Sequence, residues 1–318
     1  MLAEKIYSIL TSSQNILLIS HKKPDGDTAG ALGALYLHLT SLQKNVDAFC
    51  VDSLPPNLTF LIPINPYNND KTGLDLNKYD TIVALDCGEM KQTGIEDLLQ
   101  ARDRHTRLIN IDHHFTNNDY GDINLVNPEA SSTSEIMYEF LKKSQATITR
   151  DMANCLLTGI LTDTTYFSNG ATTIDSVKYA SELMARGANM NKITLNIWRN
   201  KNLDALKLWG DVFDRLIFNP EYKITTAIIT SDLLADRDMP EDTLDGVANF
   251  LTSIHYSKII LVLTQRDENT IKGSLRTVYD DIDVSALAQR FGGGGHKKAA
   301  GFTINGKLVW NDGDWRIE

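Results

Sequence analysis

The stretch NILLISHKKPDGDTAGALGALYLHLTSL, residues 15–42, contains the features that decide the fold of the first half of the chain. Its beginning, Asn15–Ser20, is a short apolar run that predicts a buried strand. Thr28–Leu42 is rich in alanine and leucine and predicts a helix. Between them, Pro24 and Gly26 predict a tight turn. A buried strand followed by a turn and a helix is typical of an α/β fold.

The same alternation continues to about residue 187. Further strands are predicted at Val46–Val51, Thr81–Leu85 and Arg107–Ile111. Further helices are predicted at Ser134–Lys143, Asp151–Thr162 and Ser176–Arg186. Apolar strands separated by helices predict a mostly parallel, doubly wound sheet with helices on both faces. Ligands bind to such sheets beyond the carboxyl ends of the strands, so the functional residues are expected there.

The second half has a different pattern, which is typical of a smaller α+β domain. We expect a first domain at 1–187, a linker and connecting helix at 188–215, and a second domain at 216–318. The polar segment Asn189–Asp204 is the expected linker. In the second domain, strands are predicted at Lys223–Thr230, Lys258–Thr264 and Thr270–Thr277, and helices at Leu244–Ile254 and Val284–Arg290.

The composition excludes several classes of protein. Hydrophobic residues make up 42% of the 318 residues and charged residues 23%, a balance that excludes a disordered or fibrous chain. No apolar run approaches the roughly 18 residues of a membrane span. The first residues show no signal peptide, and three scattered cysteines predict no disulfide framework, so a cytoplasmic protein without a membrane partner is expected. The net charge of −10 indicates either that the substrate is not a long nucleic acid or that a local basic pocket binds its phosphates.

Side chains that suit a metal ion follow the first predicted strand. His21, Asp25 and Asp27 all lie in the turn before the helix. One imidazole and two carboxylates, without a thiolate, suit a divalent ion such as manganese or magnesium. The alternative is a local role, because Asp27 would make a good helix N-cap and Asp25-Gly26 a good turn.

Similar side chains follow two later strands and end one helix. Asp86 ends the run Thr81–Leu85, Asp112-His113-His114 follows Arg107–Ile111, and Asp163 ends a helical segment. Taken one at a time, these residues also suit helix caps, turns or a solvated loop. Asp112 suits the role of orienting an imidazole from behind.

Taken together, the oxygen and nitrogen ligands number six: His21, Asp25, Asp27, Asp86, His113 and Asp163. Six ligands are too many for one tetrahedral site and suit two ions that share a bridging carboxylate. Two such ions roughly 3.5–4 Å apart activate a water and stabilise an in-line phosphoryl displacement. The set therefore predicts a pair of divalent cations and phosphoryl chemistry.

A second candidate site is the run FGGGGHKKAAG, residues 291–301. Its four glycines let the backbone approach a phosphate or nucleotide closely. It is not a P-loop, because no Gly-Lys-Ser/Thr follows at the required spacing. His296 and Arg276, the latter within Ser274-Leu-Arg276, suit the binding of a terminal phosphate. The alternative is a flexible loop with Arg276 on a surface strand.

In their order and spacing these motifs resemble the DHH phosphoesterase superfamily. The resemblance rests on His21-x-x-Pro-Asp25-Gly-Asp27, Leu-Asp86-Cys-Gly, Asp112-His113-His114 and Gly-Ile-Leu-Thr-Asp163-Thr. Ser274-Leu-Arg276 and Gly-Gly-Gly-Gly-His296-x-x-Ala-Ala-Gly301 resemble the DHH-associated domain that follows in one subfamily. The match covers nearly the whole chain, which is most similar to the short NrnA-type members.

The resemblance implies a role for each of these residues. Manganese would be held by His21, Asp25 and Asp86 at one position, and by Asp27, Asp86, His113 and Asp163 at the other, with Asp86 bridging. His114 would lie beside the scissile phosphate, so the catalytic set is His114, Asp86 and His113. From the second domain, the substrate would be bound by Ser274, Arg276, Gly293, Gly294, Gly295 and His296. The site would then lie in a cleft between the two domains.

The resemblance also implies an activity. We expect a manganese-dependent enzyme that hydrolyses short oligoribonucleotides, of about two to five nucleotides, because a net charge of −10 offers little to a longer polyanion. A hydroxide bridging the two ions would attack the phosphorus, and 3′-phosphoadenosine 5′-phosphate would be dephosphorylated in the same way. The alternative main activity is hydrolysis of linear or cyclic diadenylates (pApA or cyclic-di-AMP). Members of this kind are commonly homodimers, and no long nucleic acid is expected as a partner.

Overall fold

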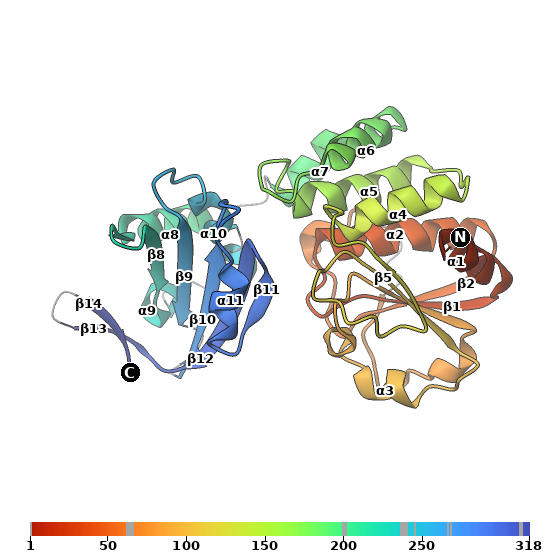
Figure 1. The fold of residues 1–318 in the computed structure, drawn as a ribbon, viewed down its shortest axis with the longest axis horizontal. Coiled ribbons are helices and arrows are strands. Elements are labelled where there is room, and N and C mark those ends of the chain that lie inside the picture. Colours follow the sequence, from red (N-terminus) through yellow and green to blue (C-terminus); the bar gives the residue numbers. More distant parts are fainter. Residues whose placement is uncertain are drawn as a thin grey trace. The chain divides into compact units, whose positions relative to one another are not determined.

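A computed structural model gives the fold and describes residues 2–61, 67–198, 202–235, 241–244, 246–265, 267, 269–311 and 314–318. The chain divides into two compact units, Met1–Asn200 and Lys201–Glu318 (Figure 1). Each unit has its own sheet and its own apolar cores. Within the described ranges, no helix has both the length and the apolar character that crossing a membrane requires.

The first unit is built on a six-stranded sheet whose paired strands all run parallel. Its strands are β1 (Asn15–Ile19), β2 (Asn45–Phe49), β3 (Tyr67–Asn68), β4 (Thr81–Leu85), β5 (Arg107–Asp112) and β6 (Ile123–Val126). The strand order is β3-β2-β1-β4-β5-β6, so the chain reverses its direction of winding between β1 and β4. The predicted parallel, doubly wound sheet is therefore confirmed. The crevice beyond the carboxyl ends of β1 and β4 is where such sheets bind ligands.

Helices cover both faces of this sheet. They are α1 (Leu2–Ser12), α2 (Gly26–Ser41), α3 (Glu96–Ala101), α4 (Thr133–Lys143), α5 (Arg150–Asp163), α6 (Ile174–Ala185) and α7 (Met190–Ile197), with 3-10 turns at Pro56–Leu58, Leu76–Lys78 and Met90–Thr93. Alternate residues of β1 enter opposite cores. Ile16 and Leu18 pack in the core that holds α2, α4 and α5, whereas Leu17 and Ile19 pack in the core that holds α3. Figure 1 shows these helices on opposite sides of the sheet.

The packing of α2 against α5 depends on glycine. A Cβ at Gly26 would lie 2.8 Å from the Cβ of Thr162, and a Cβ at Gly159 would lie 2.6 Å from Oδ1 of Asp27. Because neither glycine has a side chain, the two helix backbones approach closely. The beginning of α2 therefore lies against the end of α5, which brings Asp27 and Asp163 to the same edge of the unit.

The structure forms a helix where the sequence analysis predicts a linker. Within Asn189–Asp204, Met190–Ile197 is α7, and its Ile193 is fully buried in the core that holds α5. Met190, Ile193 and Ile197 recur at helical spacing, so they place an apolar face on that core. The interspersed asparagines and threonines, which have low helix propensity, hide this face in the sequence.

The second unit is built on a mixed six-stranded sheet. Its strands are β7 (Ile217–Asn219), β8 (Ile224–Ile229), β9 (Ile259–Gln265), β10 (Thr270–Arg276), β11 (Gly294–His296) and β12 (Ala299–Asn305). The order is β11-β12-β10-β9-β8-β7, with only the β8–β9 pair parallel among these strands. This confirms the smaller α+β domain. Gly294–His296, for which a flexible loop was the alternative, forms the edge strand.

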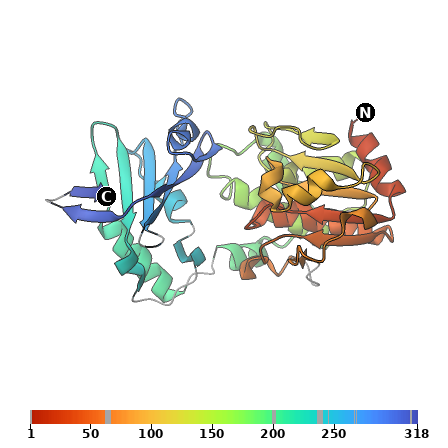
Figure 2. The same cartoon turned by 90° about the horizontal axis from the view of Figure 1, so that it is seen from below.

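The helices of the second unit are α8 (Leu203–Asp214), α9 (Ser231–Ala235), α10 (Val247–Leu251) and α11 (Val284–Gln289), with a 3-10 turn at Glu241–Leu244. The helix predicted at Leu244–Ile254 is wrong in its bounds. Gly246 has a φ of +94°, so its backbone breaks the helical path, and α10 begins only after it. A separate hairpin, β13 (Leu308–Asn311) and β14 (Asp314–Ile317), extends from this unit (Figure 2).

Candidate metal centre

The loop between β1 and α2 holds two of the predicted ligands, His21 and Asp25. Asp25 is the N-cap of α2, because its Oδ1 accepts hydrogen bonds from the backbone N–H groups of Asp27 and Thr28, both at 3.0 Å. The cap is therefore Asp25, and the alternative of Asp27 as the cap is wrong. His21 lies just beyond β1, with Nε2 3.9 Å from Oδ2 of Asp25. The capping bonds are made by Oδ1 of Asp25, and Oδ2 faces the imidazole of His21.

Asp27 lies in the first turn of α2 and is fully buried. Its carboxylate accepts the backbone N–H of Thr133 at 2.6 Å and that of Ser134 at 2.8 Å. These donors are the first residues of α4, where unpaired N–H groups favour a negative charge. The end of α4 therefore fixes the position of the buried carboxylate.

Asp86 follows β4 and lies at the middle of the cluster. It is 2% exposed and has a φ of +59°, a backbone conformation that side-chain-bearing residues rarely adopt and that persists mainly at functional sites. Thr28 Oγ1 donates to its Oδ2 at 2.7 Å, and Thr133 Oγ1 donates to its Oδ1 at 3.0 Å. His21 Nε2 lies 3.5 Å from Oδ2. Each oxygen of this carboxylate therefore faces a different part of the site.

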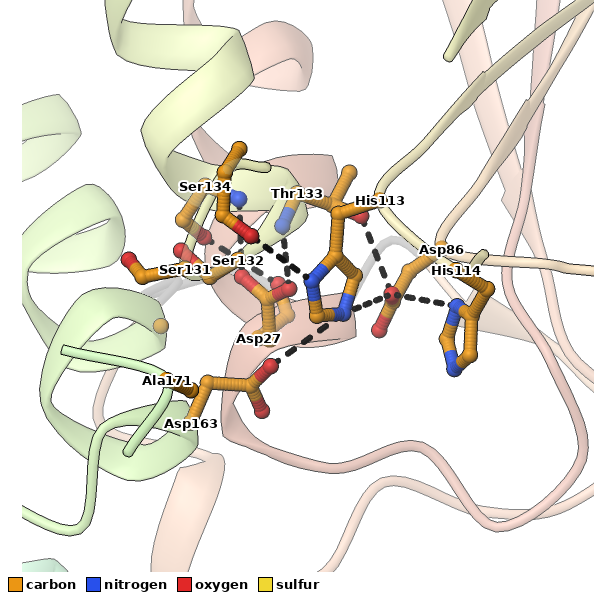
Figure 3. A network of polar contacts seen from close by, with 12 residues as sticks. Asp27, Asp86, His113, His114, Ser131, Ser132, Thr133, Ser134, Asp163 and Ala171 are labelled. Atoms are coloured by element: carbon orange, nitrogen blue, oxygen red, sulfur yellow. Dashed lines mark hydrogen bonds and ion pairs between the residues drawn. The ribbon is translucent and has the colours of Figure 1, made fainter. Parts of the chain in front are cut away.

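The two histidines after β5 diverge. His113 Nε2 lies 3.2 Å from Asp163 Oδ2 and 3.7 Å from Asp86 Oδ1. His114 instead directs Nδ1 toward Asp112 Oδ1, at 2.7 Å, and its ring is inclined at 65° to that of His113. Figure 3 shows Asp86 between the two imidazoles. Asp112 thus lies behind an imidazole, as the sequence suggests.

The structure brings all six predicted ligands together. In three groups, one nitrogen or oxygen atom from each residue lies within 4.8 Å of the others: His21 with Asp25 and Asp86, Asp27 with His113 and Asp163, and Asp86 with His113 and His114. The members come from the ends of β1, β4 and β5, the beginning of α2 and the end of α5. Asp86 and His113 each belong to two groups. The crevice at the switch of winding therefore holds one continuous cluster.

The pKa values of Asp27 and Asp163 are raised, whereas the pKa of Asp86 is lowered. Burial, followed by the charges of Asp86 and Asp25, raises the pKa of Asp27. Burial, followed by the charge of Asp27, raises the pKa of Asp163 as well. For Asp86 burial also acts upward, but the hydrogen bond from His21 and the charges of the surrounding histidines outweigh it and lower its pKa.

The imidazoles respond to the same carboxylates. Burial acts to lower the pKa of His21, but the hydrogen bond to Asp86 and the charges of Asp25 and Asp86 raise it to about 10. In the same way, Asp112 and Asp86 overcome burial and raise the pKa of His114 to about 9. The site is thus short of positive charge.

The donor set fits divalent cations. Buried carboxylates need a compensating positive charge, and a cation supplies it to several of them at once. The donors are carboxylate oxygens and imidazole nitrogens, which suit ions of the manganese and magnesium kind. Cys87 lies next to Asp86, but its Sγ is directed to the carbonyl of Leu85 at 3.3 Å. The set is therefore free of thiolate.

Residues that the sequence analysis missed hold these ligands in place. Thr28, Thr133 and Ser134 bond to Asp27 or Asp86. A signal was available, because Ser132 and Glu135 match the S-x-x-E pattern of a helix start. Ser132 is the N-cap of α4, and its Oγ accepts the N–H of Glu135 at 3.0 Å. The pattern predicts where α4 starts, but not which carboxylate its N–H groups would meet.

The predicted substrate-binding residues all belong to the second unit. In the sheet register, Gly294 lies opposite Gly301, which lies opposite Ser274, and Ala299 lies opposite Arg276. Alternate residues of a strand point to opposite faces, so these five share one face. His296 lies opposite Ala299, but its side chain is outside the described part of the structure.

Helices cover only part of this face. Ile260 and Val262 of β9, on the same face, pack against Val247 and Leu251 of α10. Beyond β9, the face consists of β10, β12 and β11, where Ser274, Arg276, Ala299 and Gly301 are only partly buried and Gly294 is exposed. A polar strip with a floor of small residues therefore lies beside α10.

The fold itself requires a glycine at two of the predicted positions. A Cβ at Gly293 would lie 2.6 Å from Cβ of Phe302, and one at Gly295 would lie 2.6 Å from Cα of Ala300. Gly295 also has a φ of +140°. A Cβ at Gly294 would meet nothing within 4 Å. Of the three glycines predicted to bind substrate, Gly294 is therefore the one with open space where its side chain would be.

Comparison with known families agrees with this geometry. The DHH family, N-terminal domain, matches residues 15–160, and the DHHA1 domain matches residues 222–312. The chain therefore carries a DHH-family N-terminal domain and a DHHA1 domain, so the resemblance in its motifs is confirmed. It is an enzyme of the phosphoester hydrolase class.

Individual relatives extend over most of the chain. The bifunctional oligoribonuclease and PAP phosphatase NrnA of Thermus thermophilus is 29% identical over 294 residues, which are 92% of this chain and 84% of the relative. The cyclic-di-AMP phosphodiesterase GdpP of Bacillus subtilis is 24% identical over 97% of this chain and 48% of the relative. The crystal structure of an exopolyphosphatase-related protein from Bacteroides fragilis has a TM-score of 0.87 and 26% identity, covering 94% of this chain and 90% of that one.

Proposed function

We propose that the protein hydrolyses short oligoribonucleotides to mononucleotides and dephosphorylates 3′-phosphoadenosine 5′-phosphate with the help of two manganese ions. The observation that carries this proposal is the position of Asp86, whose two oxygens face different ligand groups in the crevice beyond β4. One carboxylate shared by two groups suits two adjacent ions. The activity named for the relative from Thermus thermophilus supports the choice of substrates.

His21, Asp25 and Asp86 would hold one ion, and Asp27, Asp86, His113 and Asp163 the other. When bound, the two ions activate water as a nucleophile and neutralise charge on the phosphoryl oxygens. The chain itself orients these ligands. The first turn of α4 fixes Asp27, and the hydroxyls of Thr28 and Thr133 fix Asp86.

His114 would handle the proton of the leaving group. Asp112 accepts a hydrogen bond from Nδ1, which fixes the orientation of the ring, and Nε2 would then be directed toward the substrate. The hydrogen bond to Asp112 acts to raise the pKa of His114, so it favours the protonated imidazole. A protonated imidazole next to the site can donate to the departing oxygen.

Arg276 and Ser274 would bind the non-scissile phosphate, with Gly294 leaving room for the nucleotide. A guanidinium and a hydroxyl are suited to phosphate oxygens. The strip extends over three strands only, β10, β12 and β11. It therefore suits a substrate of a few nucleotides.

The second candidate is hydrolysis of linear or cyclic diadenylates as the main activity. The observation that favours it is the relative GdpP, which is named a cyclic-di-AMP phosphodiesterase and aligns with 97% of this chain. A diadenylate would need the same metal ligands and one non-scissile phosphate. The two candidates therefore differ in the preferred substrate and share the chemistry.

A manganese-supplemented hydrolysis panel tests both candidates. It contains a 5′-phosphorylated RNA dinucleotide, a pentamer, a 24-mer, 3′-phosphoadenosine 5′-phosphate, cyclic-di-AMP and pyrophosphate. We expect the dinucleotide and pentamer to be hydrolysed fastest. Faster turnover of the 24-mer would contradict the preference for short RNA, and faster turnover of cyclic-di-AMP would favour the second candidate.

The control variant is Asp86→Asn. Asparagine tolerates the positive φ at this position, so the backbone is kept while the carboxylate is lost. Activity on every hydrolysed substrate should fall by roughly 10²–10⁴-fold. Retained activity in a correctly folded variant would overturn the assignment of the centre.

A further inference from the structure

Two hydrogen bonds within the second unit hold the guanidinium of Arg276 in place. Its Nε–H donates to Oδ1 of Asn249 at 2.8 Å, and one Nη1–H donates to the carbonyl of Leu275 at 2.9 Å. A guanidinium has five N–H groups, so three of them have no partner among the described residues, and all three are on Nη1 and Nη2. The edge of the guanidinium that carries both Nη atoms is therefore the one left for an anion.

Asn249 is held in place by the helix that carries it. On either side of it in α10, Val247 and Leu251 are buried against Ile260 and Val262 of the sheet. Asn249 itself is exposed. It thus lies where α10 meets the open strip and offers its amide oxygen to Arg276 from a packed helix.

A guanidinium binds phosphate by two arrangements, one through Nε with one Nη and the other through both Nη atoms. Asn249 occupies Nε and therefore excludes the first arrangement. It also restricts the rotation of a long side chain that would otherwise lose conformational entropy on binding. Both effects favour a phosphate that approaches the Nη edge.

We propose that Asn249 is a positioning residue for substrate, which fixes Arg276 so that the non-scissile phosphate is bound through its two Nη atoms. The inference rests on the proposed role of Arg276 in the strip. Asn249 contacts the arginine and not the reacting atoms. Its effect should therefore appear in substrate binding and depend entirely on Arg276.

The experiment is a double-mutant cycle on the full chain with manganese, using Asn249→Ala, Arg276→Ala and the double variant. The substrates are pApA, which has a non-scissile phosphate, and ApA, which has none. Asn249→Ala should raise KM for pApA roughly tenfold, with little change in kcat and little change for ApA. In the Arg276→Ala background, Asn249→Ala should have no further effect. Asn305→Ala, an exposed position at the opposite end of β12 from Ala299, is the matched control.

The outcomes separate the inference from the proposed function. If Arg276→Ala raises KM for pApA but Asn249→Ala does not, the positioning role is overturned and the proposed function stands. If the two losses add in the double variant, or if ApA loses as much as pApA, Asn249 acts on the fold and the inference is overturned. If Arg276→Ala leaves KM for pApA unchanged, the role of Arg276 in the proposed function fails, and the inference fails with it.

Discussion

Gly294 and Gly295 are neighbours with opposite requirements. Gly295 has a positive φ, and a Cβ there would contact Ala299 and Ala300. Gly294 lies on the same face as Arg276 and has open space around it. The fold therefore needs a glycine at 295 but not at 294, where the missing side chain leaves room for a ligand.

This difference predicts two separable effects. Gly294→Ala should leave the unfolding temperature unchanged or slightly raised, because alanine loses less conformational entropy than glycine. It should raise KM for a 5′-phosphorylated RNA dinucleotide roughly tenfold, equivalent to about 1.4 kcal/mol. Gly295→Ala should instead lower the free energy of unfolding by about 1–3 kcal/mol. Thermal unfolding and KM, measured on both variants, check the prediction, and an unchanged KM in Gly294→Ala would remove Gly294 from the substrate site.

At the residue scale, the sequence predicts the candidate ligands better than it predicts the residues that hold them in place. Histidine and aspartate directly after apolar strands are rare enough to be noticed, so His21, Asp86 and His113 could be predicted. Thr28 and Ser134 could not, because hydroxyl residues are common at helix starts whatever they face. Whether such a residue bonds to a ligand depends on contacts between distant parts of the chain.

The beginning of α4 is the element on which the centre depends most. Glu135 is buried, and its Oε2 accepts the N–H of Ser131 at 3.0 Å, the hydroxyl of Ser131 at 2.6 Å and the hydroxyl of Thr173 at 3.1 Å. Thr173 is the N-cap of α6. One carboxylate thus ties the turn before α4 to the start of α6, and the first residues of α4, which follow that turn, present their N–H groups to Asp27.

Glu135→Gln keeps the size of the side chain but should weaken its hydrogen bonds to Ser131 and Thr173. The amide carries less charge and brings two donors of its own, so the free energy of unfolding should fall by about 1–3 kcal/mol. Because the donors to Asp27 would shift, manganese affinity should fall roughly 10- to 100-fold. Glu139→Gln, one turn further along α4, is the matched control, since it breaks a partly exposed pair with Lys143 and should cost about 0.5 kcal/mol. Titration calorimetry and thermal unfolding check both variants, and equal effects of the two would contradict the prediction.

At the element scale, the central strands are predictable and the edges are not. β1, β4 and β5 are long apolar runs buried on both faces, whereas β3 has only two residues and β6 is only partly buried. An edge strand needs fewer apolar residues because solvent covers one side of it. The short runs at such edges carry little sequence signal.

At the scale of the whole molecule, the proposed ligands and the proposed substrate-binding residues are divided between the units. The six proposed metal ligands lie in Met1–Asn200, and Ser274, Arg276 and Gly294 lie in Lys201–Glu318. Each unit has separate cores, so each has its own source of stability. The sequence predicts two units from their different patterns, but the strand order of the second unit depends on pairings between distant residues.

This division predicts that manganese stabilises the two units unequally. At a concentration 100 times its dissociation constant, an ion that binds only the folded state adds about 2.7 kcal/mol. For a unit of this size, that corresponds to a rise of about 5–10 °C in the unfolding temperature. Hydrogen exchange should slow at residues 81–90, 107–115 and 127–140 of the first unit, but not at 259–276 of the second.

Chelation and Asp86→Asn provide the two controls for this effect. Excess chelator should return the first unit to its metal-free unfolding temperature, because the buried carboxylates then lose the cation that compensates them. Asp86→Asn, which removes the carboxylate common to two ligand groups, should abolish most of the rise. An equal rise in the variant, or equal protection of the second unit, would mean that manganese binds elsewhere. The cluster would then be a network of ion pairs stabilised by its own histidines, and the pKa values of His21 and His114, at about 10 and 9, would describe its working state.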